Sequence, residues 1–313
     1  MALSKIQAES MNLADTFAFT GTVSGASTNT GRRNLIINGD FKIWQRSISS
    51  TAANYSAPDR WYYGNAGTYS RSTDVPSGEG FQYSNSVKVT AATSYGVTAQ
   101  RIEAVNCKHL VGKTVTASFW LKTITGSTGM SCVLYRANTE DGHASGATAI
   151  ETKTFTGVTG TWTYYTLTWS NLPSETTNGL QLYFFSADAG TDPEYRITGI
   201  QLEVGSQATP FEHRSFGEEL ALCQRYFSKA GIAHYHDVTS GRNYGANTGL
   251  PTEMRANPTI VASSTLDNNN RFNSGAVNGG ALVTKTSVLA HKTAVLSSDA
   301  GYYLVELDMD AEL

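Results

Sequence analysis

Three short segments of the sequence place aromatic side chains among polar ones. They are RWYYG at 60–64, ASFWLK at 117–122 and WTYYTLTW at 162–169. In a strand, alternate side chains share a face, so each segment presents one or two rings together. The flat face of Trp or Tyr covers the apolar side of a pyranose, while amide and carboxylate groups bond its hydroxyls. The candidate carbohydrate-binding residues are Trp61, Tyr63, Trp120, Trp162 and Tyr164.

Trp120 lies on the more polar face of its expected strand. It points with Ser118 and Lys122, whereas Phe119 and Leu121 take the opposite side. For all the aromatic candidates the alternative is ordinary packing, because rings in sandwich strands also fill a core or an interface between copies. The segments therefore predict a sugar platform and leave this structural alternative open.

Acidic residues that could support hydrolysis lie in expected loops. A polysaccharide depolymerase needs two carboxylates about 5 to 9 Å apart. The loop acids are Glu140, Asp141, Asp188, Asp192 and Glu194. GxSxG, HExxH, Walker and GxGxxG motifs are absent from the sequence. We therefore expect no enzymatic activity and keep a depolymerase as an alternative.

Composition limits the classes of partner. The chain has 313 residues, a net charge of -3 and 16% charged residues, so a basic footprint for nucleic acid is missing and no such partner is expected. No run approaches about 18 consecutive apolar residues, and the start does not resemble a signal peptide. We expect a protein made in a cytoplasm, without membrane insertion. The scattered cysteines, Cys107, Cys132 and Cys223, are expected to be reduced core residues.

Short strands must position the aromatic candidates. About nine alternating or apolar segments, each bounded by turn residues, run from 33 to 211 without a helical period between them. This pattern predicts a jelly-roll β-sandwich at 31–212. The stretch NLIINGDFKIWQR at 34–46 is expected to open it, with a buried strand through residues 35–37 and a tight turn at Asn38–Gly39.

A short helix and a second domain are expected after the sandwich. Ser215 and Glu218 have the spacing of a capping box, which predicts a connecting helix at 213–230. The apolar side of that helix comprises Phe216, Leu220, Cys223 and Phe227. Strand and glycine-turn patterns return at 231–313 and predict a smaller β domain. The expected fold class is all-β, with an extended N-terminal arm.

The first 30 residues differ from the rest in composition. They are polar and end in a run of Gly, Ser and Thr that is typical of a linker. Such a segment folds most readily onto a partner chain. We expect a docking arm at 1–30, with a segment lying along its own domain as the alternative.

Several stretches together resemble a known family. These are NLIINGDFKIWQR, DRWYY, VTASFWLKT, TGTWTYYTLTW, TGIQLEVGSQATPFEHRSFGEELALCQRYF and LPTEMRANPTI. They resemble tail-fibre and receptor-binding proteins of tailed bacteriophages, specifically those whose central domain is similar to a carbohydrate-binding-module jelly roll. The resemblance covers most of residues 34–260, and the last 50 or so residues match no family.

The resemblance implies a place and partners for the protein. It implies a virion tail component, made in the host cytoplasm, that touches the host cell surface and is usually a homotrimer. Three weak sites held together gain avidity, which suits adhesion to a surface polysaccharide. Residues 1–30 would then dock onto other virion tail proteins.

The same resemblance raises two metal candidates, although no cofactor is required. In jelly-roll carbohydrate-binding modules the first strand often lies beside the last, where oxygen ligands can hold calcium, here Asn38 or Asp40 with Glu203. The pair His234 and His236 resembles the iron-binding motifs of some phage fibre tips. The alternatives are a turn around Asp40 that aims Phe41 into the core, and an interface strand at the histidines.

Two functions remain from the sequence. The first is a bacteriophage tail fibre that attaches to the host by binding a surface polysaccharide. The second is a purely structural tail or capsid-decoration protein without receptor binding. An adhesin should have a cleft lined by exposed aromatics and polar groups, whereas a structural part should bury those aromatics against neighbours.

Overall fold

The computed structural model describes residues 33–64, 67–89, 96–126, 129–186, 193–238, 240, 243–267, 284–293 and 298–313. The chain divides into two units, and the second, Arg33–Leu313, contains all the described residues. The docking arm expected at 1–30 lies outside the described residues, so it stays a prediction.

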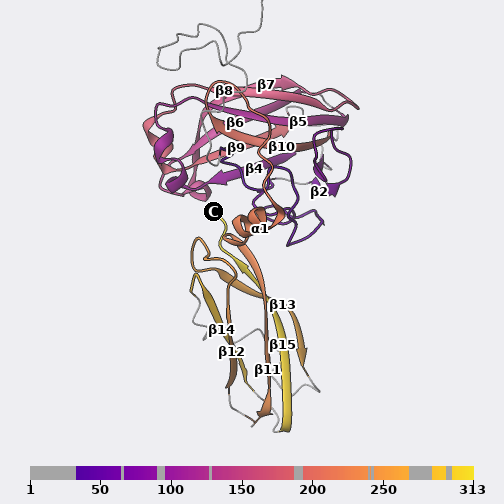
Figure 1. Ribbon diagram of the computed structural model, residues 1–313, viewed down its shortest axis with the longest axis vertical. Coiled ribbons are helices and arrows are strands. Elements are labelled where there is room, and N and C mark those ends of the chain that lie inside the picture. Colours follow the sequence, from indigo (N-terminus) through magenta and orange to yellow (C-terminus); the bar gives the residue numbers. More distant parts are fainter. Residues whose placement is uncertain are drawn as a thin grey trace, which may run out of the picture. The chain divides into compact units, whose positions relative to one another are not determined.

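Two antiparallel sheets form the first part of the second unit (Figure 1). The larger has the order β1-β2-β3-β10-β5-β8, and the smaller has the order β4-β9-β6-β7. The strands of the larger sheet are β1 (Ser49–Ser50), β2 (Gly67–Ser72), β3 (Ser84–Val89), β10 (Glu194–Val204), β5 (Val115–Thr125) and β8 (Thr163–Trp169). Those of the smaller sheet are β4 (Val97–Ile102), β9 (Leu180–Ser186), β6 (Gly129–Ala137) and β7 (Ala147–Thr156). Short 3-10 helices connect them: η2 (Ala104–Asn106), η3 (Lys108–Leu110), η4 (His143–Ser145) and η5 (Ser174–Asn178).

Alternation along the strands builds the core between the two sheets. On β5, the inward side chains of Val115, Ala117, Phe119 and Leu121 are fully buried. Phe119 meets Phe184 of β9 with ring centroids 4.9 Å apart, so the inner faces of the sheets pack directly. Burying one such side chain stabilises the fold by about 1.5–3 kcal/mol. The sheets are thus held by their inner faces, and the outer faces are free to carry polar side chains.

The stretch at 34–46 is not a strand, which corrects the expectation for residues 35–37. It lies along β10 nonetheless, because the N–H of Leu35 donates to the carbonyl of Leu202 at 2.9 Å. At Gly39 the two backbones approach so closely that a Cβ would stand 2.1 Å from the carbonyl oxygen of Ile200. Only glycine fits this contact.

Asn38 makes the turn within that stretch. Its backbone has a φ of +58°, and its side-chain amide donates to the carbonyl oxygens of Ile43 at 2.9 Å and Asp59 at 3.0 Å. Phe41 is fully buried, and Trp44 packs against the same core. The stretch therefore has a structural role, in agreement with the alternative of a turn that directs Phe41 into the core.

Helix α1 (Phe216–Gln224) follows the sandwich and begins with the expected capping box. The hydroxyl of Ser215 accepts the N–H of Glu218 at 3.2 Å, and the N–H of Ser215 donates to the Glu218 carboxylate at 3.0 Å. The helix occupies only part of the segment assigned to it, since the next strand begins at Phe227.

The buried side of α1 differs from the apolar one that the sequence predicts. Phe216 is 61% exposed, whereas Glu219 and Cys223 are buried. Glu219 accepts the backbone N–H of Asn38 at 2.6 Å and lies 3.4 Å from the guanidinium of Arg214. A buried carboxylate with these partners takes the place of the expected apolar contact.

The second β domain consists of two further sheets (Figure 1). Their orders are β11-β15-β13 and β12-β14. The strands are β11 (Phe227–Val238), β12 (Asn243–Gly249), β13 (Thr259–Asp267), β14 (Ser287–Thr293) and β15 (Ser298–Asp310). Their core contains Ile232, Met254, Val288, Leu307, Met309 and Ala311. The predicted all-β class is confirmed, and the three cysteines are free and buried as expected. No helix among the described residues is long and apolar enough to cross a membrane.

Candidate ligand groove

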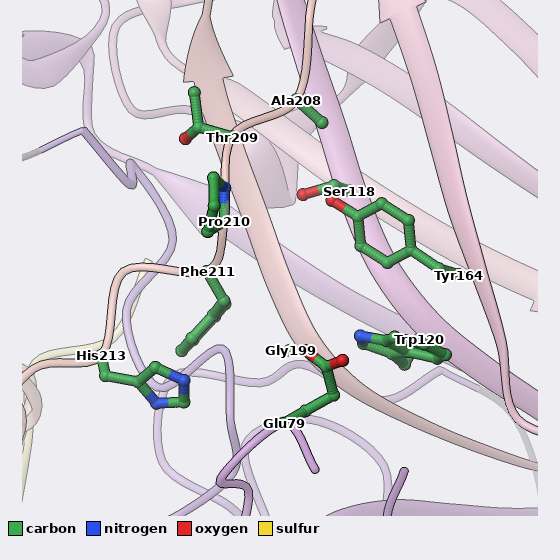
Figure 2. A pocket seen from close by; sticks show the side chains of 10 residues that line it. All are labelled: Glu79, Ser118, Trp120, Tyr164, Gly199, Ala208, Thr209, Pro210, Phe211 and His213. Atoms are coloured by element: carbon green, nitrogen blue, oxygen red, sulfur yellow. The ribbon is translucent and has the colours of Figure 1, made fainter. Parts of the chain in front are cut away.

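A groove of about 550 Å³ lies on the outer face of the six-stranded sheet (Figure 2). Strands supply its floor, and the segment that follows β10 supplies one wall. The lining residues are Ser118 and Trp120 of β5, Tyr164 of β8, Gly199 of β10, Glu79, and Ala208, Thr209, Pro210, Phe211 and His213 of the wall. Small-ligand sites typically measure about 300–1,000 Å³, so the groove has the size of a binding site.

Trp120 and Tyr164 form an aromatic pair on the floor of the groove. They are direct partners across the β5–β8 ladder, and their ring centroids lie 5.4 Å apart with planes at 51°. Tyr164 is 42% exposed and Trp120 is half-buried. Figure 2 shows both rings on the same side of the sheet, facing the wall across the groove. The two neighbouring rings provide an apolar surface on the floor of the groove.

A bulge in β10 shapes the rest of the floor. Pairing with β5 shifts between Thr198 and Gln201, which leaves Gly199 out of the ladder. Gly199 has a φ of +62°, and a Cβ there would stand 2.5 Å from the ring of Phe81. Bulges bend a strand and redirect its side chains, often beside functional sites. Here the bulge lets Phe81 pack beneath the wall.

Buried polar side chains of β10 hold the wall in place. The Glu203 carboxylate accepts the N–H of Thr209 at 2.8 Å and its hydroxyl at 2.7 Å. The side-chain oxygen of Gln201 accepts the N–H of Glu212 at 2.9 Å. Because these partners are buried, the wall is a fixed part of the groove.

Phe211 and His213 complete the wall with a small ring cluster. Both rings contact Phe81, at centroid distances of 5.2 and 5.4 Å. His213 is itself exposed and lines the groove. Glu79 extends into the groove from the floor side and brings an exposed carboxylate (Figure 2). The groove thus combines flat rings with hydroxyl, carboxylate and imidazole groups.

Asp74 organises the outer face next to the groove. It accepts the indole N–H of Trp162 at 3.0 Å and pairs with Lys122 and Arg196. Partial burial raises the pKa of Asp74, but the hydrogen bonds from Lys122, Trp162 and Arg196 outweigh it and lower that pKa below its usual value. The carboxylate therefore stays charged and fixes the Trp162 ring, over which the Lys122 ammonium lies at 5.2 Å from the ring centroid.

Three of the five aromatic candidates share this outer face. Trp120 and Tyr164 line the groove, and Trp162 lies two residues before Tyr164, held by Asp74. Trp120 lies on the outer, more polar side of β5, as the sequence predicts, Tyr164 lies opposite it on β8, and Trp162 comes directly before β8. Whether they contact a sugar stays a prediction.

Trp61 and Tyr63 must be removed from the candidate set. Both are fully buried, so no ligand can touch their rings. Trp61 stacks on Phe41 at a centroid distance of 4.9 Å and donates its N–H to the carbonyl of Asn38 at 2.9 Å. Tyr63 stacks on Tyr69 at 3.8 Å. The two residues do share a face, but it is the face that points into the core.

Glu79, Phe211 and His213 were not among the candidates. They come from irregular segments before β3 and after β10. No periodic signal marks such positions, and only the folded chain brings them opposite Trp120. The ring-rich stretch PFEHRS at 210–215 is the one hint that the sequence contained.

The carboxylates proposed for calcium have other partners. The Glu203 oxygens accept from Thr209 and Gln201, and Asp40 pairs with Lys42 at 2.8 Å. Within the described ranges, no group of three or more His, Cys, Asp or Glu side chains is placed to hold a metal. The arrangement does not fit a calcium site. His234 and His236 lie on β11, and their side chains fall outside the described part, so the iron hypothesis stays untested.

The loop acids do not form a catalytic pair in the groove. Glu140 pairs with Lys108 at 3.5 Å, and Asp141 accepts the N–H of Ala104 at 2.7 Å. Asp188 and Asp192 lie outside the described residues. Among the described residues that line the groove, Glu79 supplies the one carboxylate, and glycoside hydrolysis ordinarily needs two.

Comparisons with known proteins give weak structural likenesses. No family model matches the sequence, and no curated protein matches it. The protein is similar to the enzymatically active domain of tailspike protein 4 of bacteriophage CBA120, at 17% identity and a TM-score of 0.38, over 55% of this chain and 21% of that one. It is also similar to the C-terminal family 22 carbohydrate-binding module of Clostridium thermocellum Xyn10B, at 15% identity and a TM-score of 0.35, over 48% of this chain and 88% of that one. A CBM4 structure matches at 18% identity and a TM-score of 0.36, over 54% and 98% of the two chains. This chain spans about a fifth of the tailspike structure, and likenesses of this size carry no functional argument.

Proposed function

We propose that the groove binds a carbohydrate chain and that the protein is a bacteriophage tail component that attaches to a polysaccharide of the host surface. The observation that carries the binding part is the pair of half-buried Trp120 and exposed Tyr164 in an open groove lined by polar groups. A ring placed in a strand for packing alone would be covered, as Phe119 of β5 is.

Each side of the groove has a part in this proposal. The Trp120 and Tyr164 rings cover the apolar face of one sugar ring, which removes apolar surface from water. Glu79 accepts hydrogen bonds from sugar hydroxyls, and the His213 imidazole donates or accepts across the groove. Because Glu203 anchors the wall through Thr209, little ordering is needed when a sugar binds.

The virion part of the proposal rests on the resemblance of residues 34–260 to phage tail-fibre and receptor-binding proteins. A homotrimer that docks through residues 1–30 and presents three grooves would gain avidity for a repeating polysaccharide. The net charge of -3 favours recognition through rings and hydroxyls over a general electrostatic attraction to an anionic surface.

The experiment is saturable binding of the fluorescently labelled full-length protein to candidate host cells, competed with polysaccharide extracted from the same cells. We expect saturable binding that the soluble polysaccharide abolishes. Binding that survives an excess of polysaccharide would point to another receptor. Absence of binding to cells that the phage infects would favour the structural alternative, in which neighbouring virion chains cover the groove.

A further inference from the structure

A second hollow of about 260 Å³ lies next to the groove. His213 lines both, and the neighbouring residues Glu79 and Gly80 line one each. The groove and the second hollow are therefore adjacent: both border the loop at 79–80, and both border the His213 ring. The second hollow contains Asp40, Lys42, Gln82 and Phe216.

The polar groups of the second hollow can bond hydroxyls. The Lys42 ammonium contacts Asp40 Oδ2 and the carbonyl of Arg214, each at 2.8 Å, and an ammonium has three N–H donors. Asp40 is 6% exposed, and its Oδ1 has no hydrogen-bond partner among the described residues. With two of its donors engaged, the Lys42 ammonium keeps a third N–H that a ligand hydroxyl can accept.

Phe216 supplies an apolar surface beside these groups. It is 61% exposed although it occupies the first turn of α1, where the sequence pattern expects packing. The exposed amide side chain of Gln82 lines the same hollow. The second hollow thus resembles the first groove in its functional groups. It combines one exposed ring with an amide and with a carboxylate paired with an ammonium, and the first groove combines rings with a carboxylate and hydroxyls.

We infer that the groove continues past His213 into this hollow, and that the two bind consecutive sugar residues of one polysaccharide chain. This inference rests on the proposed function, because it assigns a second subsite to the same ligand. Lys42 pairs with Asp40. Arg214, which also lines the hollow, pairs with Glu212 and Glu219. Because each cation has its own carboxylate partner, the second subsite takes a neutral, hydroxyl-rich sugar. Phe216 stacks on that sugar, as Trp120 and Tyr164 stack on the first.

The test measures the Kd for oligosaccharides of increasing length. The probes are size fractions of a partial hydrolysate of the surface polysaccharide from cells that the protein binds, titrated into the full-length protein by calorimetry. We expect Phe216→Ala to weaken the longest fragments by roughly five- to tenfold and to leave the shortest binding fragment unchanged. Trp120→Ala should weaken fragments of every length, and Phe216→Trp should restore the affinity for the long ones.

The outcomes separate this inference from the proposed function. If fragments bind but Phe216→Ala affects all lengths equally or none, the second subsite is wrong and the first groove stands. If the wild-type protein binds no fragment of any length, the proposed function fails and the second subsite with it. Phe216 is exposed, so the variant should keep the wild-type Tm, which also checks that the fold is intact.

Discussion

At the scale of single residues, His143 links burial to a measurable pH dependence. It lies in η4 and is 5% exposed. Burial lowers its pKa from about 6.5 to about 4, and the positive charge of Arg101 acts in the same direction. The folded protein therefore holds this imidazole neutral at pH values where the unfolded chain protonates it.

We predict that the contribution of His143 to stability is complete above pH 6.5 and is lost as the pH falls through 4, by roughly 3 kcal/mol in total. His143→Gln cannot titrate, so its Tm should fall less than that of the wild type between pH 6.5 and 4. Burial raises the pKa of Asp59 to about 6, so its effect on stability over this pH range has the opposite sign. Because the wild type and His143→Gln both contain Asp59, this effect cancels in the comparison. Parallel Tm curves for the two proteins would contradict the prediction.

At the scale of elements, β10 and the segment after it set the shape of the groove. The bulge at Gly199 redirects the strand. Further along β10, Glu203 holds the wall through its hydrogen bonds with Thr209. The floor depends on the register of β5 and β8, in which Trp120 and Tyr164 stand opposite each other. Floor and wall thus come from separate elements that β10 joins.

We expect Glu203→Ala to release the wall without unfolding the sandwich. The variant removes the acceptor of two hydrogen bonds from Thr209, and an unpaired buried donor costs about 1–3 kcal/mol. Polysaccharide affinity should fall, and protease cleavage within residues 205–213 should become faster. Thr209→Val is the matched control, because it keeps the backbone N–H bond and should have a smaller effect. Equal affinity of Glu203→Ala and the wild type would show that the wall is not part of the site.

The elements also show which residues of the groove could be predicted from the sequence. Alternation correctly gave Trp120 the outer face of β5, because Phe119 and Leu121 on the opposite face are fully buried. The same alternation could not tell that the face of Trp61 and Tyr63 is the buried one, since residues 60–64 contain aromatic rings on both sides. Glu79 and His213 belong to irregular segments, which only long-range packing places.

The apolar pattern of α1 predicted the wrong buried side of the helix for a related reason. Phe216 recurs with Cys223 at helical spacing, but the position that is buried with Cys223 belongs to Glu219. That carboxylate is needed by the N–H of Asn38, a residue 181 positions away in the sequence. Hydrophobic periodicity contains no information about such a distant polar partner.

At the scale of the whole second unit, buried ion pairs join its last residues to the jelly roll. Glu312 pairs with Arg60 and, at 3.3 Å, with Arg46. Arg60 is 1% exposed, and its guanidinium lies 3.4 Å from the ring centroid of Tyr226. The end of β15 therefore contacts the sandwich through charges that have been removed from water.

Glu312→Ala should destabilise the protein by about 3–5 kcal/mol, because it leaves the buried Arg60 charge without its partner. Asp310→Ala is the matched control: Asp310 pairs with Arg46 at 3.1 Å, but its side chain is 44% exposed, so its loss should cost less than about 1 kcal/mol. Chemical denaturation measures both values. Similar losses for the two variants would mean that the burial of Arg60 does not decide the stability of this contact.

The central claim is that the sugar lies on the Trp120 face of the sandwich. The most direct test is the Kd of the extracted polysaccharide for the wild type, Trp120→Ala and Tyr135→Ala. Tyr135 lies on β6 of the opposite sheet, where its ring contacts Tyr183 at 5.6 Å, so its removal also deletes a partly exposed ring. We expect Trp120→Ala to weaken binding at least tenfold, equivalent to about 1.4 kcal/mol, and Tyr135→Ala to bind like the wild type. Loss of binding in Tyr135→Ala with unchanged binding in Trp120→Ala would contradict the account and place the ligand on the four-stranded sheet.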